Sequence, residues 1–483
     1  MIACLRPLSA LILAGLLTAC ATSSNSGLGE LPRTPNASIE QLLQQASQSK
    51  PEEAALLRLS AADLAYQQKD LARSTAILGQ IPLESLKPAL QQQQASIESW
   101  QQQNPEHPAA KHLPAALEKL KTLSQQPLTR IALLLPQQGQ LANVARALQD
   151  GFLAAHFQAQ QAGQNPPSIK LYDSTQVRSL DDFYRQAQAD GVELVVGPLE
   201  KPLVKQLASR EQLPITTLAL NYSDNSQEGP AQLFQFGLAA EDEARAVASR
   251  AWGDGMRRAV ALVPRGEWGD RVLAAFSQSW QSAGGSLIAA EHVDQPVQLA
   301  QQIADLLQLR QSEGRAQRLQ GALGSQIATQ PSRRQDIDFV FLAATPQQAR
   351  QIKPTLAFQY AGDLPVYATS HLYTGTNNPT QDQDLNGIRF CETPWLLNPS
   401  DPTRQQVAAQ WPQANGSMGR LYAMGVDAYR LAPRLPELKA VPSLQIDGLT
   451  GTLSLNPTQR IERQLQWAEF RNGQVQPLGT SSF

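Results

Sequence analysis

The chain has 483 residues, which is room for about three domains of ordinary size. Its 40 basic residues nearly balance its 42 acidic residues, and it contains no long run of like charge, so the sequence lacks the basic field that attracts nucleic acids. The apolar fraction of 42% is ordinary for a globular protein.

The first twenty residues have the pattern of a targeting segment. Arg6 supplies a positive charge, and Leu8 to Leu17 form an apolar run that is too short to span a bilayer stably. The run ends in Leu17-Thr18-Ala19-Cys20, which resembles a bacterial lipobox. This resemblance implies removal of residues 1–19 as a lipoprotein signal peptide and modification of Cys20 with S-diacylglycerol and an N-acyl (palmitate) chain. No Asp follows Cys20, which favours the outer membrane; an ordinary secretory signal is the alternative.

The chain has three cysteines, and their positions exclude an intramolecular disulfide in the mature form. Cys4 leaves with the signal and Cys20 carries the lipid, so Cys391 remains alone. No base neighbours Cys391 in the sequence, and a half-buried structural thiol on a strand is the favoured interpretation.

Residues 20–35 are rich in Ser, Gly, Asn and Pro and predict a flexible tether. From Asn36, which can cap a helix over Ser38 to Ser49, the pattern is helical up to residue 126. Residues 62–72 have the features of one tetratricopeptide-type hairpin, but no second copy follows at the repeat spacing. We predict a small all-α (tetratricopeptide-like) domain over residues 36–126. His107 and His112 fall in a proline-rich break and are interpreted as loop histidines.

At Thr129 the rhythm changes to alternating strands and helices, which predicts an α/β domain with parallel sheets over residues 127–483. The short run Val192 to Val196 is apolar, β-branched and bounded by glycines, so it is typical of a strand buried on both faces. Gly197-Pro198 ends this strand, at the edge where such sheets bind ligands. The predicted strands are Thr129–Leu135, Ile169–Tyr172, Val192–Val196, Pro214–Leu218, Arg258–Val263, Ser286–Ala290, Asp338–Leu342 and Pro365–Ala368.

Helices are predicted between these strands, and the chain closes with β structure. Arg310 to Arg334 is polar and predicts an exposed insertion. After residues 448–455, the stretch Arg460 to Phe470 and a turn at Asn472-Gly473 predict a β meander. The predicted helices are Leu141–Gln158, Asp181–Ala189, Glu200–Arg210, Glu241–Trp252, Trp268–Ala283, Val297–Leu309, Pro346–Gln359 and Met418–Leu431.

Two α/β lobes in this order resemble type 1 periplasmic binding proteins. The resemblance rests on Val196-Gly197-Pro198, on residues 421–428 and on the hairpin Gly448-Leu449-Thr450-Gly451. A lipobox, a helical domain and this two-lobed domain together resemble the LpoA (LppC) family of outer-membrane lipoproteins, most closely at residues 197–201 and 214–221. Longer members of that family carry a larger array of helical repeats.

The resemblance implies an outer-membrane lipoprotein that faces the periplasm and activates a class A penicillin-binding protein. It would thereby regulate peptidoglycan synthesis, cell wall biogenesis and cell shape by binding, without a cofactor. The alternative is a membrane-tethered solute-binding or sensor protein that uses the cleft between the lobes.

No motif for catalysis is present: the sequence lacks a Gly-x-Ser-x-Gly elbow, a phosphate loop and a His-Glu-x-x-His metal motif. The five histidines are scattered, and His371 is favoured as a hydrogen-bonding residue over a general base. We therefore predict no enzyme activity, no cofactor and no metal site.

Residues that follow predicted strand ends are the candidates for a cleft. Tyr222, Trp268 and Tyr373 are bulky enough to fill the space between the lobes, so we expect no tight binding of free amino acids or sugars. The candidates are Ser174, Thr175, Gly197, Pro198, Asn221, Tyr222, Glu267, Thr345, Ser370, His371 and Tyr373.

Overall fold

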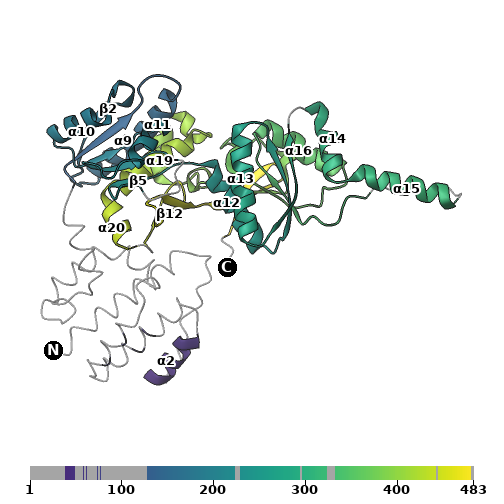
Figure 1. Cartoon of the computed structure of the whole chain (residues 1–483). Coiled ribbons are helices and arrows are strands. Elements are labelled where there is room, and N and C mark those ends of the chain that lie inside the picture. Colours follow the sequence, from purple (N-terminus) through teal and green to yellow (C-terminus); the bar gives the residue numbers. More distant parts are fainter. Residues whose placement is uncertain are drawn as a thin grey trace. The chain divides into compact units, whose positions relative to one another are not determined.

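The structure is a computed structural model that describes residues 38–48, 58, 61, 73, 77 and 128–479, apart from 224–228, 294–295, 324–331 and 442–443. The chain divides into two units, of which one contains residues 1–126 and 440–445 and the other residues 127–439 and 446–483 (Figure 1). Cys20, the predicted tether, the hairpin predicted at residues 62–72, His107 and His112 lie outside the described residues.

In the first unit the structure describes one helix, α2 (Ile39–Gln48), which confirms the helix predicted over Ser38 to Ser49. Its cap is Ser38, because the Gln41 N–H donates to Ser38 Oγ (3.3 Å) while the Ser38 N–H donates to the Gln41 side-chain oxygen (2.8 Å). Asn36, the predicted cap, lies outside the described residues.

The second unit begins with a lobe built on a five-stranded parallel sheet in the order β2-β1-β3-β4-β5, which we call lobe 1. Helices α10 and α11 pack on one face of the sheet, and α9 packs against β1. The elements are β1 (Arg130–Leu135), α9 (Ala142–Gln161), β2 (Ser168–Asp173), α10 (Leu180–Ala189), β3 (Leu194–Val196), α11 (Lys201–Ala208), β4 (Thr216–Ala219) and β5 (Leu233–Gln235).

The centre of lobe 1 agrees with the sequence pattern. The strand predicted at Val192 to Val196 is shorter than expected: β3 contains its last three residues, and all three are buried, as in a strand covered on both faces. Gly197 follows it with φ +107°, and a Cβ there would overlap the carbonyl of Leu134, so a glycine is required. Strand β5 was not predicted, since three residues carry no periodicity.

Lobe 2 is built on a seven-stranded sheet in the order β15-β14-β10-β9-β8-β6-β7, parallel except for β14 and β15. Alternate strand residues face opposite layers: α12 and α13 cover one face, and α14 and α16 the other. The strands are β6 (Arg258–Pro264), β7 (Ser286–Val293), β8 (Phe339–Leu342), β9 (Val366–Ala368), β10 (Ile388–Glu392), β14 (Gln466–Arg471) and β15 (Gln474–Leu478).

The helices of lobe 2 include one that the sequence pattern did not predict. The insertion expected at Arg310 to Arg334 forms helix α15 as far as Leu323, and this helix extends away from the sheet (Figure 1). The helices are α12 (Ala240–Gly253), α13 (Glu267–Ser282), α14 (Pro296–Leu306), α15 (Leu309–Leu323), α16 (Pro346–Phe358), α17 (Pro394–Leu397) and α18 (Pro402–Gln410).

The closing β structure differs from the predicted meander. Arg460 to Phe470 was predicted as one strand, but it divides at Leu465 into β13 (Ile461–Gln464) and β14. Strand β13 pairs with β12 (Thr452–Leu455) in a three-stranded sheet that also contains β11 (Gln445–Asp447), whereas β14 pairs with β10 of lobe 2. The turn at Asn472-Gly473 is confirmed, and both residues have the positive φ that a two-residue hairpin turn requires.

Helix α19 (Gly419–Leu431) follows the lobe 2 helices in the chain but packs against α9 of lobe 1. Two glycines allow this close approach, because a Cβ on Gly151 would overlap the carbonyl of Tyr422 and a Cβ on Gly425 would overlap that of Leu148. In the described part of the chain, no helix has the length and apolar character needed to cross a membrane.

Candidate functional site

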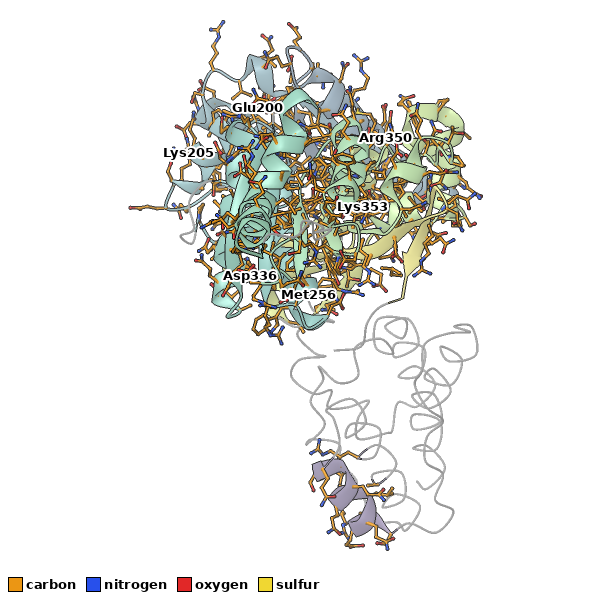
Figure 2. The ribbon with its side chains drawn as sticks, turned by 90° about the vertical axis from the view of Figure 1, so that its right-hand side faces the viewer. Glu200, Lys205, Met256, Asp336, Arg350 and Lys353 are labelled. Carbon is orange, nitrogen blue, oxygen red and sulfur yellow. The ribbon has the colours of Figure 1, made fainter. Side chains whose placement is uncertain are left out.

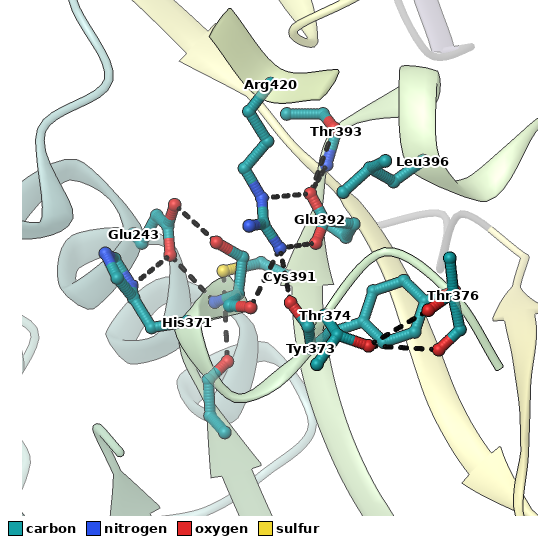
Figure 3. A network of polar contacts seen from close by, with 12 residues as sticks. Glu243, His371, Tyr373, Thr374, Thr376, Cys391, Glu392, Thr393, Leu396 and Arg420 are labelled. Carbon is teal, nitrogen blue, oxygen red and sulfur yellow. Dashed lines mark hydrogen bonds and ion pairs between the residues drawn. The ribbon is translucent and has the colours of Figure 1, made fainter. Parts of the chain in front are cut away.

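A group of polar side chains lies where strands β9 and β10 end, and we call Glu243, Ser370, Tyr373, Glu392 and Arg420 the junction cluster (Figure 3). Ser370 opens the short turn after β9; its N–H and its hydroxyl donate to the two carboxylate oxygens of Glu243 at 2.8 and 2.9 Å. Glu243 comes from the first turn of α12, where the helix dipole stabilises a carboxylate.

Arg420 connects the two lobes at this point, since it lies at the start of α19 and its partners all belong to lobe 2 (Figure 3). Its Nε donates to Glu392 Oε1 at 3.0 Å, and its Nη2 donates to Glu392 Oε2. The same Nη2 also donates to the carbonyls of Ser370 (3.0 Å) and Tyr373 (3.1 Å). Because Glu392 is fully buried and its charge is paired, this contact holds α19 against the strand ends.

The junction cluster is strongly polarised. Burial by itself raises the pKa of the Glu243 carboxyl, but the His371 side chain and the guanidinium groups of Arg463 and Arg420 outweigh burial and lower this pKa to about 2. Burial lowers the pKa of Arg420, yet the neighbouring Glu392 carboxylate outweighs it and the net pKa is raised. Both groups are therefore charged throughout the physiological pH range.

A second contact between α19 and the chain that connects the lobes is made by Asp427, which is 1% exposed. Its carboxylate accepts from the N–H groups of Leu449 (2.8 Å) and Thr450 (2.7 Å) and from the Thr450 hydroxyl (2.6 Å). The predicted Gly448–Gly451 hairpin is thus fixed to α19 by a buried side chain.

Of the predicted cleft residues, the structure brings Ser370, His371 and Tyr373 together. His371 Nδ1 lies 3.4 Å from Glu243 Oε2, and its ring packs against Trp268 with 4.8 Å between the ring centres. Burial raises the pKa of Tyr373 to about 12. Trp268 and Tyr373 contribute to packing here, as expected from their bulk.

In lobe 1, polar atoms of the predicted cleft residues form hydrogen bonds with other residues of the same lobe. Ser174 donates to Glu200, and the Thr175 hydroxyl donates to Asp173 at 2.7 Å. The Asn221 amide donates to the Leu199 carbonyl at 3.0 Å. The Pro198 carbonyl accepts from the Leu220 N–H at 3.0 Å, and Gly197 N–H donates to the Leu218 carbonyl at 2.8 Å.

The three remaining candidates do not lie in the junction cluster. Tyr222 donates to the Ile461 carbonyl at 2.8 Å and so links lobe 1 to β13. Glu267 is exposed at the start of α13 and pairs with Arg271, and Thr345 caps α16 through Gln348. Both of these residues serve helix starts, which is a common use of acidic and hydroxyl side chains after a strand.

Comparison with known proteins places this architecture in a family. Residues 32–91 and 87–473 match the sequence family described as "LppC putative lipoprotein". The chain belongs to the LppC family. A relative from Pectobacterium parmentieri, named penicillin-binding protein activator LpoA, is 31% identical over 456 residues, which covers 80% of this chain. The match spans 67% of the relative's own length.

Two solved structures resemble the second unit of this LppC-family chain. The C-domain of LpoA (YraM) from Haemophilus influenzae, a regulator of PBP1A, has a TM-score of 0.58 and 26% identity; the match covers 73% of this chain and all of that domain. A Chromobacterium violaceum protein assigned to branched-chain amino acid ABC transport has a TM-score of 0.53 and 29% identity, with coverage of 71% and 100%. The fold therefore confirms the predicted two-lobed, periplasmic-binding-protein-like class.

Sequence reasoning missed three members of the junction cluster in this LppC-family chain. Glu243 was hidden in an acidic first helical turn, Glu392 follows Cys391 directly, and Arg420 lies in the first turn of the predicted helix Met418–Leu431. The only available signal was that a charged residue ends the apolar strand at Cys391. Cys391 itself was predicted to be half-buried, but it is fully buried, and burial raises its pKa.

The junction cluster of the LppC-family chain is suited to holding two lobes together and offers little to catalysis. Its carboxylates accept hydrogen bonds from Ser370, Thr393 and Arg420, so neither is free to act as a base. Among the described residues, no group of three or more His, Cys, Asp or Glu side chains is placed to bind a metal ion.

Proposed function

We propose that this chain is an outer-membrane lipoprotein that binds and activates a class A penicillin-binding protein from the periplasmic side. The observation that carries the proposal is the similarity of the second unit to the whole LpoA C-domain of H. influenzae, a regulator of PBP1A. The name of the P. parmentieri relative supports the same function. Regulation of peptidoglycan synthesis would follow from this contact alone.

The polar contacts of the second unit favour a protein-binding role over the alternative, a tethered solute sensor. The similarity to an amino acid transport protein is the observation behind that alternative. In this chain, however, Ser370 is bonded to Glu243, Asn221 to Leu199, and Ser174 to Glu200. A solute would have to replace these buried or partly buried hydrogen bonds, and a buried polar group left without a partner costs about 1–3 kcal/mol.

Activation by binding sets a thermodynamic requirement. The chain must bind the active conformation of the synthase more tightly than the inactive one, because a partner with equal affinity for both conformations shifts neither. A tenfold preference corresponds to about 1.4 kcal/mol. One interface of ordinary size is enough to supply this difference.

Anchoring at Cys20 gives the contact its geometry. Residues 21–35 span at most about 50 Å when fully extended, at roughly 3.4 Å per residue. A lipid on Cys20 would hold one end of the chain at the outer membrane, while the synthase is anchored in the inner membrane. Stimulation would then occur where the cell wall is open enough for the two proteins to meet.

Binding of the full chain, purified in detergent, to a class A penicillin-binding protein tests the proposal. We expect saturable binding, and no binding to a monofunctional transpeptidase used as the control. Absence of binding to the class A enzyme would refute the proposal. Calorimetry against amino acids and sugars tests the alternative: a micromolar dissociation constant, about −8 kcal/mol, would favour the solute sensor.

A further inference from the structure

The insertion in lobe 2 has a net positive charge, although the net charge of the whole chain is negative. Residues 309–334 contain five arginines and one glutamate, so their net charge is +4, while the whole chain has −2 and the remainder therefore −6. Helix α15 has 15 residues and extends roughly 22 Å at 1.5 Å per residue. Figure 1 shows it directed away from the other elements of lobe 2.

The C-terminal end of the insertion, residues 332–334, is attached to lobe 2. Arg333 pairs with Asp363 at 2.7 Å, and Arg334 makes two contacts with Asp336 at 2.6 and 2.7 Å. The Ser332 N–H donates to Ser312 Oγ of α15 at 3.0 Å. We call α15 together with residues 332–334 the basic arm. These contacts attach the C-terminal end of the basic arm to lobe 2.

Two exposed aromatic residues lie close to this attachment, at the end of α16. Phe358 is 77% exposed and Tyr360 is 45% exposed. The residue between them, Gln359, donates to the Ala300 carbonyl of α14 at 3.2 Å, which places the pair beside the helix that leads into the arm. Tyr360 also has a positive φ of 58°, an uncommon conformation for a bulky side chain.

The exposed arginines of α15 point to a partner with negative charge. Arg315 and Arg318 are exposed on α15, and within the described residues neither pairs with a carboxylate. Figure 2 views the molecule from the side to which α15 extends and labels Lys353 on α16 and Asp336 at the arm's base. Arginines and aromatic residues are both enriched in protein–protein interfaces and in their hot spots.

We propose that the basic arm and the pair Phe358–Tyr360 form the docking surface for the penicillin-binding protein, and that they bind an acidic face with an apolar centre. This inference rests on the proposed function and adds the surface that performs it. The aromatic pair supplies buried apolar area, and the arginines steer the encounter and set its dependence on salt. The acidic remainder of the chain would repel the same face.

The test uses full chains purified in detergent and a class A penicillin-binding protein. We expect R315E/R318E to weaken binding at least tenfold at low salt, with a smaller effect at high salt, and F358S/Y360N to weaken it at least tenfold at both. R178E/R185E makes the same charge change on exposed residues of lobe 1, and F157S removes an exposed aromatic residue from α9; both controls should bind like the wild type.

Each of the following four outcomes would overturn the inference. If the wild type binds and both arm and aromatic variants bind within twofold of it, the docking surface lies elsewhere and the proposed function still stands. If R178E/R185E weakens binding as much as R315E/R318E, the effect is one of net charge. If R315E/R318E loses only binding to phosphatidylglycerol vesicles, the arm serves a membrane. If the wild type fails to bind, the proposed function fails as well.

Discussion

Arg420 connects several members of the junction cluster, because its guanidinium donates hydrogen bonds to Glu392 and to two carbonyls of lobe 2. We expect R420M to lower the free energy of unfolding by about 3–5 kcal/mol, because it leaves Glu392 buried and unpaired. Arg471 is paired with Glu469 but is 54% exposed, so R471M should cost about 0.5 kcal/mol or less. Urea unfolding measures both; a loss below about 1 kcal/mol for R420M would contradict the role given to this pair.

The low pKa of the Glu243 carboxyl predicts how the stability of the fold depends on pH. Its pKa is lowered from 4.5 to about 2 in the folded chain, so it stabilises the fold above the unfolded pKa and loses this contribution as the pH falls towards 2. Between pH 5 and pH 2 the wild type should lose on the order of 3 kcal/mol more than E243Q, which does not titrate. Urea unfolding at a series of pH values gives this difference, and parallel curves for the two proteins would argue against it.

At the residue scale, the sequence allowed only part of the site to be predicted. Ser370, His371 and Tyr373 were found because they follow a strand, and a chain position is enough to place them at a sheet edge. Arg420 and Glu243 reach the same place from helices more than 170 residues apart in the sequence. No local sequence pattern predicts that Arg420 and Glu243 lie close together, because their positions depend on how the two lobes pack.

At the scale of elements, the crossing of α9 and α19 depends on two glycines. G425A should destabilise the second unit by about 1–3 kcal/mol, because the new Cβ would overlap the Leu148 carbonyl and the helices would have to separate. Gly314 in α15 is the matched control: nothing lies within 4 Å of a Cβ there, and G314A should stabilise the helix by about 0.5–1 kcal/mol. Thermal unfolding of both variants checks this, and equal melting temperatures would speak against the close crossing.

Elements with a strong pattern were predicted, and elements defined by pairing were not. Strands such as β1 and β6 are continuous apolar runs, which a buried parallel sheet requires. Strand β5 has only three residues, and the break at Leu465 is visible only when β13 and β14 pair with different sheets. The helix in the insertion lacked the apolar stripe that identifies a packed helix: among the described side chains of α15, only Leu309 and Ser312 are buried.

At the scale of the whole molecule, the proposed lipid on Cys20 would determine where the chain acts. We expect C20A to leave the outer-membrane fraction and to migrate differently from the lipidated wild type, because the tether would have no lipid. Fractionation of the envelope, followed by immunoblotting, measures both changes. The variant must still be exported for the comparison to hold, which a periplasmic marker protein controls. A variant that stays in the outer membrane with unchanged mobility would disprove lipid anchoring.

The most direct test of the central claim is the rate at which a class A penicillin-binding protein polymerises glycan chains from lipid-linked precursor, with and without the full chain. We expect a several-fold higher rate at saturating chain, and a much smaller increase with R315E/R318E at the same concentration. An unchanged rate under conditions where the two proteins demonstrably bind would contradict the account.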